Sequence, residues 1–236
     1  MTVGEAAMRE PSWSDVQLWF ETIDAIVRGL GHGLNNRALA LSATIESLDP
    51  KRPVGQQVST ALRQESERLT ELLRQLRVLP FTSDREPMPI LLRDVLSGAV
   101  HLHRAHASVG DVPAYLEGSA DTPPVLALES SLLHAALVTL TALKTFAAPH
   151  GVVRITCTGT PDQASVLFQA MRDPGDAHEP VSGETLVKPT SLAAALLGSG
   201  LLEIEQRIGP DVATMVWLMP SLKVMRRRSR EASAVA

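Results

Sequence analysis

The sequence predicts an α+β protein in which a long N-terminal helical hairpin precedes a sandwich of helices packed on one face of a sheet. Two apolar stripes with helical spacing come first, joined by a short link that contains prolines. Helix and strand patterns then alternate, and most of the strands form hairpin-linked pairs. Hydrophobic residues make up 44% of the 236 residues and aromatic residues only 3%, so we expect an aliphatic core.

The first stripe extends from Trp13 to Leu48, and its apolar residues are three or four positions apart. Two prolines, Pro50 and Pro53, end it. A second stripe, from Val58 to Leu79, completes a hairpin over residues 12–80. A lone hairpin leaves one face of each helix uncovered, so we expect a homodimer in which two copies form a four-helix bundle.

The second part of the chain follows a proline-containing linker at residues 80–89. It is expected to form one domain over residues 88–222, followed by a disordered basic tail at 223–236. The predicted helices cover residues 91–106, 129–147 and 191–197, and the predicted strands cover 112–116, 152–158, 164–171, 201–206 and 213–219. Pro113 indicates that the first of these strands lies at an edge of the sheet.

Charge and cysteine content restrict the class of protein. There are 22 Lys and Arg residues against 26 Asp and Glu, a net charge of −4, which argues against a nucleic-acid partner. The single cysteine, Cys157, excludes an internal disulfide and suits a reducing cytoplasm. We also expect no signal peptide and no membrane span. We expect no metal site at His101, His103 and His106, because the first two face apart on a helix and no cysteine lies near them. These features predict a cytoplasmic protein.

The first helix contains an unusual segment, Gly29-Leu30-Gly31-His32-Gly33-Leu34-Asn35-Asn36. Each glycine weakens a helix by about 1 kcal/mol relative to alanine, so helix propensity does not explain three of them. Leu30 and Leu34 belong to the apolar stripe, so His32 is expected to face solvent. An isolated histidine on a helix is most often an ordinary surface residue; the glycines and the asparagine pair favour a functional one.

The segment His32-Gly33-Leu34-Asn35-Asn36 resembles the phosphoacceptor box, H-x-L/F-N-N, of two-component sensor histidine kinases. The resemblance extends over residues 20–220 and implies a dimerising hairpin followed by an ATPase-like sandwich of the GHKL type. It implies that His32 accepts a phosphoryl group and that Asn36, one turn later, orients that group or a water molecule. Asn35 and Arg37 are candidate partner-binding residues, with an ordinary surface role as the alternative for each.

The nucleotide-binding motifs of that family are degraded here. The position of the family's magnesium-binding Asn is assigned to Leu143, which cannot coordinate a hard cation. The adenine-recognition motif D-x-G-x-G is reduced to Asp173 and Gly175. The phosphate-cradling G-x-G-L is replaced by Ser191-Leu192-Ala193-Ala194, whose side chains obstruct close backbone approach. We therefore expect no productive binding of ATP.

The resemblance thus implies a histidine phosphotransferase, similar to those of bacterial phosphorelays. His32 would exchange a phosphoryl group with aspartates of response-regulator receiver domains, which would supply the Mg²⁺ ion. Two alternatives stay open: a non-catalytic regulator that binds a kinase or a receiver, and an active sensor histidine kinase with an atypical ATP site.

Overall fold

The computed structural model describes residues 13–48, 51, 53–80, 86–118, 121–173, 184–198 and 201–235. The elements in chain order are α1 (Trp13–Glu46), α2 (Gln56–Val78), β1 (Met88–Ile90), α3 (Leu92–His103), β2 (Ala114–Gly118), β3 (Val125–Ala127), α4 (Glu129–Ala147), β4 (Val152–Thr160), β5 (Gln163–Met171), α5 (Glu184–Leu197), β6 (Glu203–Ile208), β7 (Val212–Pro220) and α6 (Leu222–Val235). The mixed α+β architecture, with a helical N-terminal part, agrees with the fold class predicted from the sequence.

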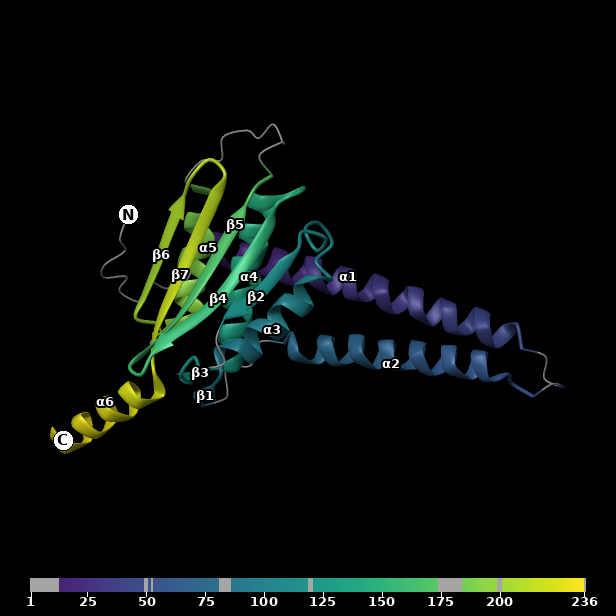
Figure 1. Ribbon diagram of the computed structural model, residues 1–236, viewed down its shortest axis with the longest axis horizontal. Helices are drawn as coiled ribbons and strands as arrows, with labels where there is room; N and C mark the ends of the chain where they lie inside the picture. The colour runs from purple at the N-terminus through teal and green to yellow at the C-terminus, as the bar shows by residue number, and fades with distance from the viewer. Residues whose placement is uncertain are drawn as a thin grey trace.

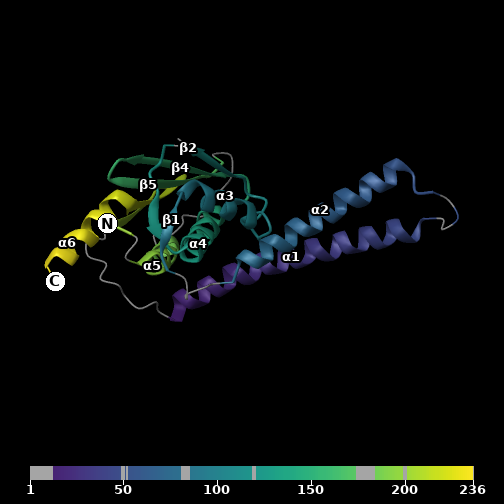
Figure 2. The ribbon, with the colours of Figure 1, turned by 90° about the horizontal axis from the view of Figure 1, so that it is seen from below.

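Helices α1 and α2 form an antiparallel pair that projects from the rest of the molecule (Figure 1). Side chains of the two helices contact each other along the pair, and Arg37 of α1 forms an ion pair with Glu65 of α2. Helix α1 has 34 residues and α2 has 23, so α2 covers only the C-terminal part of α1. The N-terminal part of α1 continues past α2 and reaches the second part of the chain (Figure 2).

The second part of the chain is built on a five-stranded sheet of order β2-β4-β5-β7-β6. Strand β2 is parallel to β4, and the other neighbours are antiparallel. Buried and partly exposed residues alternate along β5 and β7, so one face of the sheet is covered and the other faces solvent. Strand β2 lies at an edge, as Pro113 predicts.

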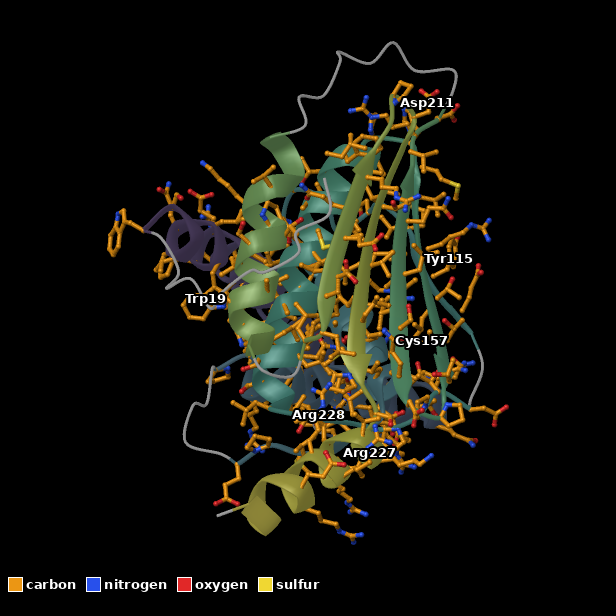
Figure 3. All side chains as sticks on the ribbon, turned by 90° about the vertical axis from the view of Figure 1, so that its left-hand side faces the viewer. Trp19, Tyr115, Cys157, Asp211, Arg227 and Arg228 are labelled. Atoms are coloured by element: carbon orange, nitrogen blue, oxygen red, sulfur yellow. The ribbon has the colours of Figure 1, made fainter. Side chains whose placement is uncertain are left out.

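Helices α3, α4 and α5 cover the buried face of the sheet, with α4 at the centre; Figure 3 shows α4 and α5 on one side of the strands. Leu132, Leu137 and Leu140 of α4 are fully buried. On the sheet side of the core, the rings of Phe168 and Trp217 lie 4.6 Å apart. Among the described helices, α4 alone is long and apolar enough to cross a membrane, which the sequence analysis did not anticipate. Most of α4 is buried in the molecule, as in the core helix of a folded domain.

The N-terminal part of α1 forms a further layer over α4 and α5 (Figure 2). Ile26 and Leu30 of α1 are completely buried and belong to the same hydrophobic cluster as the residues of α4. Full burial of such a side chain contributes about 1.5–3 kcal/mol. The hairpin and the sandwich therefore share one hydrophobic core, although the sequence analysis treats them as separate domains.

Three local features differ from the expectations. Helix α5 begins at Glu184 rather than at residue 191, with Pro189 inside it. Strands β1 and β3 pair with each other and were not predicted. Residues 222–235 form α6 where we expected a disordered tail. The segment has no Gly or Pro, its start is capped by the Ser221 hydroxyl, which accepts from the Val224 N–H at 3.4 Å, and Arg227 and Glu231 form an i,i+4 pair at 3.9 Å.

Candidate functional site

His32 lies on α1, and its side chain is exposed, as the spacing of Leu30 and Leu34 predicts. The Asn36 Nδ2 atom lies 3.0 Å from the His32 Nε2 atom and can donate a hydrogen bond to it. In that arrangement the neutral ring carries its proton on Nδ1 and its lone pair on Nε2. An imidazole nucleophile attacks through that lone pair. The Asn36 amide is therefore within reach of any group that becomes bonded to Nε2.

The three glycines around His32 have different surroundings. A Cβ atom at Gly29 would lie 1.6 Å from the carbonyl oxygen of Ala105, so the backbones approach too closely there for any other residue. A Cβ at Gly31 would meet nothing within 4 Å, and one at Gly33 would make ordinary contact with Leu72. The packing therefore explains Gly29. Gly31 and Gly33 flank His32 without obstructing it.

Asn35 is exposed and adjacent to Asn36 on α1. Arg37, by contrast, is engaged within the chain. Its Nη1 atom lies 3.2 Å from both carboxylate oxygens of Glu65, which also accepts from Arg68 at 2.5 Å. The guanidinium of Arg37 thus joins α1 to α2. Arg37 is only a candidate partner-binding residue from the sequence, and a partner that binds it would share it with Glu65.

Leu39 is a further exposed residue near His32 that the sequence analysis missed. Its side chain is 60% exposed. It follows His32 by seven residues, which places the two within about 20° of each other around the helix axis. Leu39 lies outside the periodic apolar stripe, and this is the signal that could have identified it. His32, Asn36 and Leu39 thus form an exposed face with a nucleophile, an amide and an apolar contact.

The positions assigned to a nucleotide site do not come together as a phosphate-binding loop. Leu143 is completely buried in the hydrophobic core. Ser191 and Ala193 lie within α5, where Ser191 is exposed and Ala193 is buried. Backbone N–H groups inside a helix already donate to carbonyl groups four residues earlier. Asp173 follows β5 and is exposed, and Gly175 lies outside the described residues.

A cluster of buried basic side chains lies between α3, α4 and the loop after α3. The rings of His103 and His106 stack with their centroids 4.9 Å apart, and His103 Nε2 lies 2.9 Å from the Thr141 hydroxyl. Lys144 is buried and donates to the carbonyl oxygen of Gly110 at 3.2 Å. Among the described residues, no group of three or more His, Cys, Asp or Glu side chains is placed to hold a metal ion.

Burial shifts the pKa values of this cluster toward the neutral forms. It lowers the pKa of Lys144 to about 8, an effect that Arg104 increases and Asp111 opposes. Burial also lowers the pKa of His103 well below its usual value, and that of His106, with a further contribution from the charge on Lys144 in each case. Burial thus favours the neutral form of all three groups.

His134 of α4 connects the core to α1. Its Nδ1 atom accepts a hydrogen bond from the indole N–H of Trp19 at 2.8 Å. Burial lowers the pKa of His134, and its interaction with the backbone of Leu79, just after α2, partly opposes this shift. A neutral His134 thus contacts both ends of the hairpin where they meet the sandwich.

Comparisons with known proteins return similarity in structure only. No protein-family model matches the chain, and no curated protein matches it in sequence. The similar solved structures include histidine kinase ThkA in complex with the response regulator protein TrrA (12% identity, 81% of this chain and 59% of that one, TM-score 0.46). They also include a histidine kinase from Burkholderia phymatum (13%, 89% and 99%, 0.45) and a bacterial phosphotransferase (12%, 84% and 96%, 0.41). Because these TM-scores lie below 0.5, function has to be inferred from the residues of this chain.

The buried histidines predict that the protein loses stability in mild acid. Above about pH 6.5, His103, His106 and His134 are neutral in both the folded and the unfolded chain. Below that value the unfolded chain takes up protons that the folded chain does not, so the free energy of unfolding falls as the pH is lowered. Urea unfolding at pH 7.5 and 5.5 measures this loss. His134→Gln should make the loss of unfolding free energy smaller, while His150→Gln, at an exposed position, should leave it unchanged. An equal loss in both variants would show that the buried His134 does not contribute to it.

Proposed function

We propose that this protein is a histidine phosphotransferase that exchanges a phosphoryl group between His32 and the aspartates of receiver domains. One observation carries the proposal: an exposed imidazole has its Nε2 atom 3.0 Å from the amide nitrogen of Asn36. The resemblance of residues 32–36 to a phosphoacceptor box supports the same reaction. The cytoplasm, where the single cysteine would stay reduced, is the proposed compartment.

The exchange needs little from this chain beyond an oriented nucleophile. The Nε2 lone pair attacks the phosphorus of an aspartyl phosphate, the bond between phosphorus and the carboxylate oxygen breaks, and the aspartate leaves as a carboxylate. The reverse reaction with a second receiver returns the phosphoryl group to an aspartate and frees the imidazole. The receiver holds the Mg²⁺ that neutralises charge on the phosphoryl oxygens. Asn36 would donate to one of those oxygens.

Several observations support a reaction that does not use ATP. The positions where the resembling family has a phosphate-cradling loop lie inside α5, and their N–H groups take part in the helix. Leu143, assigned to the metal ligand, is a core residue. The amine of Lys144, next to it, donates to the Gly110 carbonyl. The phosphoryl donor in this proposal is therefore another protein.

The face around His32 suits a protein partner. Leu39 offers an exposed apolar contact about two turns from the nucleophile, and Asn35 offers a polar one beside it. An apolar contact surrounded by polar groups is typical of protein interfaces. We propose that a receiver docks over these residues, with its phosphorylated aspartate directed at His32.

A second copy of the chain is the proposed partner for a different face of α1. Phe20, Val27 and Ile45 are exposed by 66%, 41% and 57%. They follow one another by seven and eighteen residues and so lie on one side of the helix. His32 lies about 140° around the axis from Val27. A homodimer formed through these apolar residues would cover them and leave both His32 side chains exposed.

The phosphotransfer itself is tested with phosphorylated receiver domains from the source organism. Wild-type protein should acquire an acid-labile phosphoryl group from at least one receiver and donate it to at least one other. His32→Ala should remove all labelling, because it removes the imidazole that forms the bond to phosphorus. His150→Ala, at an exposed histidine outside the helices, should label normally. Failure of the wild-type protein to accept label from any receiver would refute the function.

Asn36 should affect the rate of transfer rather than the existence of the phosphorylated state. Asn36→Ala removes a hydrogen bond to the phosphoryl group worth about 1–2 kcal/mol, so transfer should slow by roughly tenfold. Stopped reactions with one receiver under single-turnover conditions give this rate. Ser42→Ala, at an exposed position on the same helix, serves as the control and should transfer at the wild-type rate. Equal rates in the two variants would remove Asn36 from the mechanism.

The homodimer is tested by light scattering. The wild-type protein should have twice the 25.4 kDa mass of one chain. Val27→Glu combined with Ile45→Glu should give a monomer, because buried unpaired carboxylates are costly in an apolar interface. Leu39→Glu places the same charge on the other side of α1 and should stay dimeric. A wild-type monomer at micromolar concentration would contradict this arrangement.

A further inference from the structure

The contact between α1 and the sandwich has the character of a protein core. Ile26 and Leu30 of α1 are completely buried in one continuous cluster with residues of the sandwich, and Ile23 packs against that cluster. Leu72 and Leu76 of α2 pack against it as well. Separating the sandwich from the hairpin would expose these side chains to water.

Polar and backbone contacts fix the position of the sandwich along α1. Trp19 donates to His134 at 2.8 Å. Two turns later, the Ala25 carbonyl accepts from the Ala107 N–H at 3.2 Å. One further turn along, Gly29 allows the Ala105 carbonyl to approach the helix backbone. The three contacts lie on the N-terminal side of His32, and Gly29 is only three residues from it.

The loop that makes two of these contacts is itself held firmly in the sandwich. Lys144 of α4 donates to the Gly110 carbonyl at 3.2 Å. The His106 ring stacks on His103 of α3 with the ring centroids 4.9 Å apart, and within the loop it accepts from the N–H groups of Ser108 and Val109 at 3.3 Å. This loop, residues 104–110, therefore has partners on α1 and in the sandwich at the same time. It does not have the character of a hinge.

We infer that the sandwich is a fixed support for the phosphoacceptor helix and does not move relative to α1 during the reaction. A mobile arm that delivers a phosphoryl group to His32 would have to break the Trp19, Ala25 and Gly29 contacts and expose Ile26 and Leu30. A fixed support needs none of this and leaves His32 accessible to a visiting protein throughout. The functional part of this inference rests on the proposed phosphoryl exchange; the structural part does not.

A reversible cross-link tests whether motion is required. The two cysteines of an Ala25→Cys, Ala107→Cys double variant are joined by a bis-maleimide whose spacer contains a disulfide. A reductant cleaves that disulfide and releases the cross-link. The native Cys157 is buried and burial raises its pKa to about 11, so it should not react. The cross-linked protein should exchange phosphoryl groups within twofold of the same protein after cleavage. A loss of tenfold or more that reductant restores would show that the sandwich must move, and would overturn the inference.

A matched pair of glycine variants tests the fixed position without any phosphotransfer. In the double-cysteine background, Gly29→Ala puts a methyl group against the Ala105 carbonyl, and Gly31→Ala puts one into open space. Both gain the same helix propensity. Gly29→Ala should slow cross-linking at least fivefold, and Gly31→Ala should leave it unchanged. Equal cross-linking rates in the two variants would overturn the inference even if His32 transfers phosphoryl groups normally. Slower cross-linking of Gly29→Ala alone would support the contact between Gly29 and Ala105 even if His32 never carries a phosphoryl group.

Discussion

The burial of Ile26 and Leu30 against α4 is the constraint on which the arrangement of this molecule depends. The two side chains together contribute about 3–6 kcal/mol, comparable to the whole net stability of many small domains. Because they lie on the same helix as His32, the sandwich and the candidate phosphoacceptor cannot be treated as independent parts. The length of α1 matches its two sets of contacts. Its first half packs against α4 and α5 of the sandwich, and its second half packs against α2.

The sides of α1 have different surroundings, and this explains the residues that its apolar stripe does not account for. One side carries Ile26 and Leu30 into the core, and Gly29 permits the close approach of a loop. Arg37 crosses to Glu65 of α2. Another side presents exposed apolar residues such as Val27, and the remaining one presents His32. The glycines are tolerated because tertiary packing, rather than propensity, stabilises most protein helices.

Most elements could be predicted from the sequence because their patterns are long. The apolar periodicity of α1, the long apolar run of α4 and the alternation in β5 and β7 are local properties. Strands β1 and β3 have three residues each, too few for a pattern. Helix α6 was missed because its arginines suggested a disordered basic tail. The His32–Asn36 contact follows from the i,i+4 spacing of a helix. The role of Gly29 could not be predicted, because its cause is a carbonyl group 76 residues later, at Ala105.

The same packing bears on the phosphoryl donor in the proposed exchange. Helices α4 and α5 lie against each other under α1, and the backbone of residues 191–194 is used within α5. A phosphate-binding loop at residues 191–194 would need free backbone N–H groups, so this part of α5 would have to unwind. Unwinding it would also disturb the contacts of α5 with α1 and α4. The proposed protein donor avoids this cost, because His32 is exposed on α1.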